Sequence, residues 1–177
     1  MAVSLYIDQS YGASLTRFEG VTNLNFKSLD DVASGTAVTP ISRGSNSYIK
    51  HISGRLLGSW TSLLAGYAYR DSSRSGELTN MLVFGGPTLG YSGSTTGQMG
   101  GGTLIAGTSA GTTQGVNPTL VLRFGNASAG LASFTSASNN IGVSVFTDFL
   151  RLQLVTTPSC STGAIPSMTW VFAVNEA

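Results

Sequence analysis

The chain has 177 residues, a formal net charge of +1 and a charged fraction of only 10%, whereas an average soluble domain has about 25% charged residues. This length suits one domain with one core, and the near-neutral charge excludes the basic field that nucleic-acid-binding proteins need. A polar but almost uncharged surface is typical of a subunit that is locked into a larger assembly.

The N-terminal residues 1–18 are expected to form an arm that contacts a neighbouring subunit, and residues 19–177 a single β-domain. Apolar and aromatic side chains stand among polar ones in the arm, at Leu5, Tyr6, Ile7 and Tyr11. The segment has no basic n-region followed by a long apolar run, so we expect no signal peptide. No uninterrupted run of apolar residues approaches the length of about 18 that a transmembrane helix needs, so no transmembrane helix and no membrane partner are expected.

Alternation of apolar and polar residues recurs along the chain and predicts short β-strands. Gly58-Ser59 is the expected turn of a hairpin, because glycine tolerates the positive φ of tight turns. The last run, MTWVFAV, is apolar on both faces and is expected to be a central strand. In chain order, the predicted strands are VTNLNFKS (21–28), 47–57, 60–70, LTNMLVFGG (78–86), TLVLRFG (119–125), FLRLQLV (149–155) and MTWVFAV (168–174). Such strands between Gly, Ser, Asn and Pro clusters predict an all-β sandwich or barrel.

The stretch GQMGGGTLIAGTSAGTTQG, residues 97–115, is dense in glycine and hydroxyl residues and has no charge. A phosphate-binding loop would need a lysine after the glycines, and no lysine follows Lys50. Leu104, Ile105 and Ala106 are too apolar for a freely solvated linker. We therefore expect an ordered loop that contacts a partner, with Leu104 and Ile105 in the interface.

Residues that could support catalysis are few. A Ser/His/Asp triad would have to use His51, the only histidine, with Asp71 or Asp148 orienting it; the expectation is instead a histidine on the outward face of a strand. Cys160 is expected to be a small, half-buried side chain. No catalytic, cofactor-binding or metal site is therefore predicted.

Carboxylates leave one enzymatic alternative open. Asp30 and Asp31 are adjacent but lack the spacing of a calcium loop. A pair of distant carboxylates in a sandwich cleft would make a glycosidase.

Tyr67 and Tyr69, two residues apart on one predicted face, would mark a carbohydrate-binding module instead.

Three segments carry a resemblance to a known family. They are NSYIKHISGRLLGSWTSLLAGYAYRDSS, LTNMLVFGGPTLGYSGSTTG and TDFLRLQLVTTPSCSTGAIPSMTWVFAVNEA. In this order they resemble small β-sandwich virion proteins of tailed bacteriophages, with a closing pair of strands at 152–154 and 170–172 before Glu176. The resemblance covers residues 46–177 and leaves out the arm and the glycine-rich stretch.

The resemblance implies a jelly-roll-like β-sandwich and a non-enzymatic virion protein that transfers no catalytic residue to this chain. The expected role is capsid decoration, a cement protein that bridges capsid subunits. A phage tail, neck or baseplate component and a carbohydrate-binding β-sandwich module are the alternatives. The implied partners are further copies of the chain and the major capsid protein or another virion subunit. The chain would be made in the host cytoplasm and end in the virion.

Overall fold

The computed structural model describes residues 4–22, 24–30, 39–58, 62–71, 80–88, 91, 93, 95–99, 103–108, 122–124, 134–135, 145–162 and 169–176. Every regular element in these residues is a β-strand, and every pairing of strands is antiparallel. This confirms the all-β prediction. No helix that could cross a membrane occurs in the described ranges.

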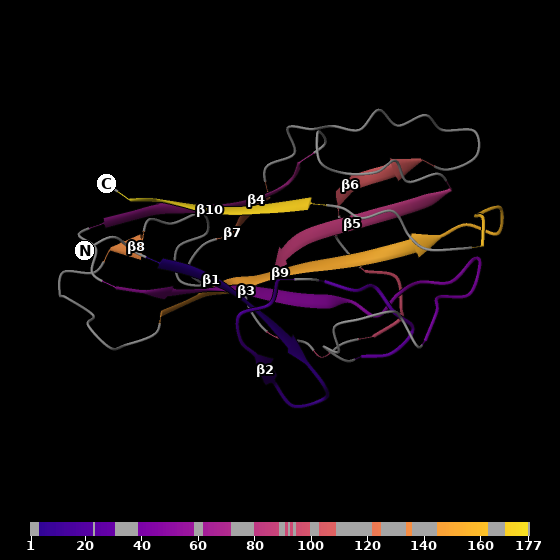
Figure 1. Ribbon diagram of the computed structural model, residues 1–177, viewed down its shortest axis with the longest axis horizontal. Helices are drawn as coiled ribbons and strands as arrows, with labels where there is room; N and C mark the ends of the chain where they lie inside the picture. The colour runs from indigo at the N-terminus through magenta and orange to yellow at the C-terminus, as the bar shows by residue number, and fades with distance from the viewer. Residues whose placement is uncertain are drawn as a thin grey trace.

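The larger sheet has six strands (Figure 1). Its order is β2 (Thr16–Phe18), β1 (Ser4–Tyr11), β3 (Lys50–Leu57), β9 (Val145–Thr156), β5 (Met81–Thr88) and β6 (Thr103–Thr108). The longest strand, β9, therefore lies between β3 and β5 and ties the N-terminal half of the sheet to the C-terminal half.

The smaller sheet has four strands. They are β10 (Thr169–Glu176), β4 (Ser62–Asp71), β7 (Leu122–Phe124) and β8 (Phe134–Thr135). β10 pairs with one side of β4 along its whole length, and β7 and β8 also pair with β4.

One apolar cluster joins the two sheets. On β9, Leu150, Leu152 and Leu154 alternate with other residues and are almost fully buried, as a strand with one core face requires. Trp170 and Phe172 of β10 pack against this cluster from the other sheet. Burial of each leucine contributes about 1.5–3 kcal/mol, so the β9 row is a main source of the cohesion between the sheets.

The N-terminal segment belongs to the larger sheet. β1 pairs with β3 from Ser4 opposite Leu57 to Ser10 opposite His51, and β2 pairs with the end of β1. The expectation that residues 1–18 lie outside the fold was therefore wrong for residues 4–18, because the β3 edge offers backbone partners along the whole strand. Contact with a neighbouring subunit stays a prediction.

The expected hairpin between residues 47–57 and 60–70 was also wrong. Gly58 has a positive φ of 111°, but the strands before and after it, β3 and β4, lie in different sheets. The glycine therefore lets the chain cross from one sheet to the other.

Three further expectations need correction. Residues 24–27 form no strand, although Phe26 is in the core cluster. Within the stretch 97–115, residues 103–108 form β6, because their backbone pairs with β5; residues 100–102 and 109–115 lie outside the described part. MTWVFAV forms β10, but among the described strands β10 is at the end of its sheet and not in the centre.

Candidate functional site

Polar side chains gather on one face of the larger sheet. Side chains alternate along a strand. The neighbours of the core residues Ile52 on β3 and Leu150 and Leu152 on β9 therefore lie on the face that points away from the core cluster. We call this the outer face. The register places Asp8 opposite Ser53, Ser10 opposite His51, and His51 opposite Arg151. Three neighbouring strands thus bring an acid, a base and hydroxyl groups together.

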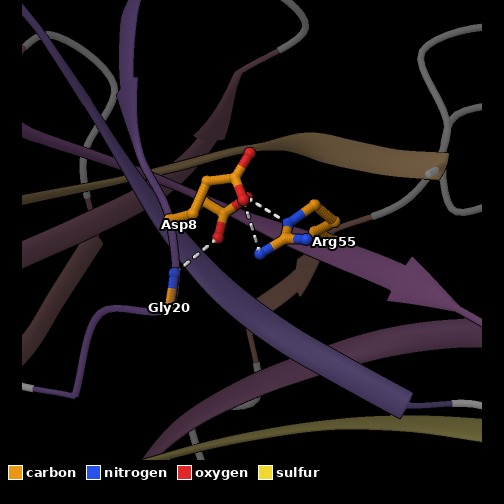
Figure 2. Close-up of polar contacts among 4 residues, drawn as sticks. Asp8, Gly20 and Arg55 are labelled. Atoms are coloured by element: carbon orange, nitrogen blue, oxygen red, sulfur yellow. Dashed lines mark hydrogen bonds and ion pairs between the residues drawn. The ribbon is translucent and has the colours of Figure 1, made fainter.

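Asp8 is a buried charge on the outer face with two donors. Its side chain is fully buried, and its Oδ2 lies 2.9 Å from Nε of Arg55. Its Oδ1 accepts a hydrogen bond of 2.9 Å from the backbone N–H of Gly20. Figure 2 shows the carboxylate held between these two donors. A buried carboxylate is tolerated only when it is paired in this way.

Arg55 extends the ion pair towards the surface. Its second nitrogen, Nη2, lies 3.1 Å from Oε2 of Glu19, whose side chain is 62% exposed. Its guanidinium carbon lies 5.2 Å from the ring centre of Tyr6, a cation–π contact. Arg55 is thereby held by three side chains, those of Asp8, Glu19 and Tyr6. These contacts connect β1, β3 and the segment that follows β2.

The prediction placed His51 on the outward face of a strand; it lies on the outer face of β3, but its side chain is fully buried there. The rings of Tyr91 and Phe149 pack against it, with ring centres 4.8 Å and 6.1 Å away and edge-to-face geometry. Among the described residues, neither ring nitrogen of His51 has a hydrogen-bond partner. The imidazole therefore sits in an aromatic enclosure, which favours its neutral form.

The electrostatics agree with this enclosure. Burial, followed by the positive charge of Arg151, lowers the pKa of His51 from 6.5 to about 4, while the carboxylate of Asp30 acts in the opposite direction. His51 is consequently neutral at physiological pH. A general base must reach the proton that it removes; in this structure the imidazole of His51 is fully buried, and its nitrogens have no hydrogen-bond partner among the described residues.

The turn after β1 closes the enclosure. Gly12 has a φ of 83°, in the region that favours glycine. Its N–H donates to Oδ2 of Asp30 at 2.6 Å, and its carbonyl accepts from the hydroxyl of Tyr91. Asp30 and Tyr91, which are far apart in sequence, are thus both tied to the backbone of Gly12.

Gln153 organises a second buried polar group on the outer face. Its Oε1 accepts from the N–H of Met99 at 2.8 Å. Its Nε2 donates to the carbonyls of Ser47, at 2.9 Å, and Gly97, at 2.8 Å. One side-chain amide therefore satisfies three backbone groups and pins the start of the glycine-rich stretch to β9.

A hollow of about 390 Å³ opens beside the segment 42–46. Among the described residues, its walls are formed by small residues, most of them polar: Ser28, Ser42, Gly44, Ser45, Asn46 and Thr96. Thr156 holds the segment, since its hydroxyl is 2.9 Å from the carbonyls of both Ser42 and Ser45. The described residues of the hollow offer hydroxyl and amide groups to a ligand, and none of them is charged.

The residues predicted for an interface lie in two strands. Leu5, Tyr6, Ile7 and Tyr11 are in β1, where Tyr6 is 43% exposed and Ile7 packs against the core cluster. Leu104 and Ile105 are in β6, at the other end of the same sheet. The structure therefore does not bring the two predicted groups together.

The residues considered for chemistry lie in both sheets. Asp71 ends β4 in the smaller sheet, His51 is in β3 of the larger sheet, and Asp148 is in β9, the strand that pairs with β3. Tyr67 and Tyr69 are in β4. Cys160 is buried in the core cluster and more enclosed than the half-buried side chain expected. Asp31 lies outside the described residues.

Sequence reasoning missed Asp8, Arg55 and Gln153 as organising residues. Asp8 is a polar residue in the alternating pattern of β1, and such positions are predicted to face solvent. The same is true of Gln153 on β9. The available signal was the rarity of charge: in a chain with so few charged residues, an acid and a base inside strand patterns are candidates for a pair.

A scan of protein-family models, a search of curated proteins and a search of solved structures each found no match to this chain.

Proposed function

We propose that this protein is a non-enzymatic structural subunit of a phage virion that decorates the capsid and bridges its subunits. The observation that carries the proposal is the way in which the chain uses its reactive residues. Asp8, Arg55 and His51 are all engaged inside the fold, between strands. Such groups stabilise a scaffold, and the chain has few other charged residues, since its charged fraction is only 10%.

The strand pairing supports a jelly roll, the fold proposed here. A jelly roll places consecutive strands in two sheets through two Greek keys. In this chain β3 pairs with β9 in one sheet while β4 pairs with β10 in the other, and β5 pairs with β9. The additional pairing of β6 with β5 and β7 with β4 is the order expected of seven consecutive jelly-roll strands. Viral capsid domains are among the proteins with this fold.

Bridging of capsid subunits would act through many weak contacts. Each apolar square ångström that is buried contributes about 25 cal/mol, and repetition over a lattice multiplies small contacts. Particles that lack this chain should therefore release their genome at a lower temperature than complete particles. Equal release temperatures for the two kinds of particle would contradict the bridging role.

The hydroxyl-lined hollow favours carbohydrate binding as a second candidate. Lectins also use jelly rolls, and the groups from Asn46 and Thr96 match the hydrogen-bonding needs of a sugar. A glycan array with the purified chain tests this function. The expected pattern is binding that the Thr96→Val variant weakens; an array without any signal would remove the candidate. A role in the tail, neck or baseplate is the other alternative, and microscopy of labelled particles separates it from capsid decoration.

A further inference from the structure

We propose that His51 and the residues that cover it form an acid-sensitive latch, in which a proton on the imidazole opens the cover. The cover consists of Gly12, Asp30 and Tyr91, and none of these three residues lies in a strand. The latch goes beyond the role proposed above and does not depend on it, because it is a property of the isolated chain.

Three segments that are distant in sequence meet in the cover. The N–H of Gly12, in the turn after β1, donates to Oδ2 of Asp30 at 2.6 Å. The hydroxyl of Tyr91, in the segment after β5, donates to the carbonyl of Gly12. The ring of Tyr91 packs against His51 and Phe149, with ring centres 4.8 Å and 5.8 Å away. The side chain of Tyr91 therefore links the imidazole to the turn at Gly12.

The closed cover does not accommodate a charged imidazole. Nδ1 and Nε2 of His51 are both buried, and neither has a hydrogen-bond partner among the described residues. The hydroxyl of Ser10, the residue opposite His51 on β1, is also unpartnered and so makes no hydrogen bond to the ring. An imidazolium presents two N–H donors, and a buried charge without partners costs far more free energy than a buried neutral group.

The charges around His51 also disfavour a proton on the ring. After burial, the next largest cause of its lowered pKa is Arg151, which lies opposite His51 on β9; the carboxylate of Asp30 in the cover acts in the opposite direction. Other charged or titratable groups on this side of the sheet are Tyr6, Asp8, Arg17, Glu19, Arg55 and Tyr91. Asp8 and Glu19 are engaged with Arg55, so neither offers His51 an unpaired counter-charge.

Opening of the cover relieves this conflict without unfolding the sheet. β3 is paired with β1 and β9, and β9 with β3 and β5, so His51 and Arg151 lie in strands that are held on both sides. Segments outside strands open at a lower free energy than paired central strands. Once water reaches the imidazole, its pKa returns towards 6.5. The open state then binds a proton that the closed state does not, and the open fraction rises as the pH falls below 6.5.

Amide exchange of the full chain, corrected for the intrinsic pH dependence of exchange, tests the latch at Gly12. Its protection should fall about thirtyfold from pH 7.5 to pH 5, the factor by which protonation of an ordinary histidine favours the open state. Leu154, whose N–H donates to Oγ of Ser47, should stay far better protected at both pH values. Equal protection of Gly12 and Leu154 at pH 5 would mean that the whole domain opens, and would overturn the proposal.

His51→Phe is the matched variant, because a phenyl ring fits the aromatic enclosure and binds no proton. Gly12 should keep its protection at pH 5 in this variant. A fall as large as that of the wild type would assign the pH dependence to another group, such as Asp30, and would overturn the proposal.

Nuclear magnetic resonance of the wild-type chain covers the case in which the variant does not fold. As the pH is lowered, the ring signals of His51 should titrate together with the loss of protection at Gly12. An imidazole that takes up its proton while the Gly12 amide stays protected would show that the cover tolerates the charge, which also overturns the proposal.

Discussion

Two buried polar sites lie next to each other on β1 and β3 and differ in how they are stabilised. Asp8 keeps its charge and has donors from Arg55 and Gly20. His51 lies two residues before Ser53, the residue opposite Asp8, and on the same face. Aromatic rings pack against its imidazole, which has no hydrogen-bond partner among the described residues. The comparison teaches that the two sites avoid an uncompensated charge in different ways: Asp8 is buried with its donors, and His51 is buried in its neutral form.

Removal of Asp8 should have the largest effect on this comparison. Asp8→Ala leaves the guanidinium of Arg55 mostly buried, and Glu19 is then its only ionic partner among the described residues. We expect a loss of about 3–5 kcal/mol in the free energy of unfolding, the usual consequence of breaking a buried pair. Urea denaturation measures it. The double variant Asp8→Leu with Arg55→Met should recover much of the loss, because no charge is then left unpaired; a double variant as unstable as Asp8→Ala would contradict this explanation.

Replacement of Gln153 should have the next largest effect. Gln153→Leu keeps the side-chain size and removes three hydrogen bonds to backbone groups of Ser47, Gly97 and Met99. We expect a loss of about 3 kcal/mol, because buried groups are left unsatisfied. Amide exchange at Met99 should also become faster, since its N–H loses its acceptor. Unchanged exchange at Met99 would show that Gln153 does not hold this segment.

Acid should destabilise the protein through His51. Its folded-state pKa of about 4 lies below the value of 6.5 expected when unfolded, so between these values the unfolded chain binds a proton that the folded chain does not. Stability should therefore fall as the pH decreases from 6.5 towards 4, by about 2 kcal/mol at pH 5. Chemical denaturation at several pH values measures this. His51→Phe fits the aromatic enclosure and should flatten the profile between pH 7 and 5; an unchanged slope would place the effect elsewhere.

The smallest effect is expected at the outer end of the ion pair. Glu19→Gln removes a charge that is mostly in water, so the loss should be below about 1 kcal/mol. The matched comparison with Asp8→Ala sharpens the contrast between a buried and an exposed partner of the same arginine. A loss at Glu19 as large as that at Asp8 would mean that burial is not the deciding property.

The sequence predicted the elements that alternate clearly, and it did not predict how they pair. Leu150, Leu152 and Leu154 identified β9 and its core face, and the pattern around Trp170 identified β10. The predicted pairing of β3 with β4 was wrong. Alternation is a local property that does not identify the neighbouring strand, and Gly58 suits a hairpin turn as well as a crossing between sheets. β1 was read as an arm for the same reason: only its register with β3 shows that Asp8, Gln9 and Ser10 are buried.

The candidate site was even less visible in the sequence. The contacts of His51 depend on Tyr91 and Phe149, which are distant along the chain, and no spacing rule connects them. Asp30 and Tyr91 meet at Gly12 only because three separate segments converge there.

The most direct test of the central claim, that this chain is a structural part of a virion, is negative-stain microscopy of purified phage particles with an antibody against it. The account predicts label distributed over the capsid surface at many positions per particle. Label confined to the tail or neck would retain a virion role and reject decoration. Particles without label, prepared from lysates in which the chain is abundant, would contradict the claim.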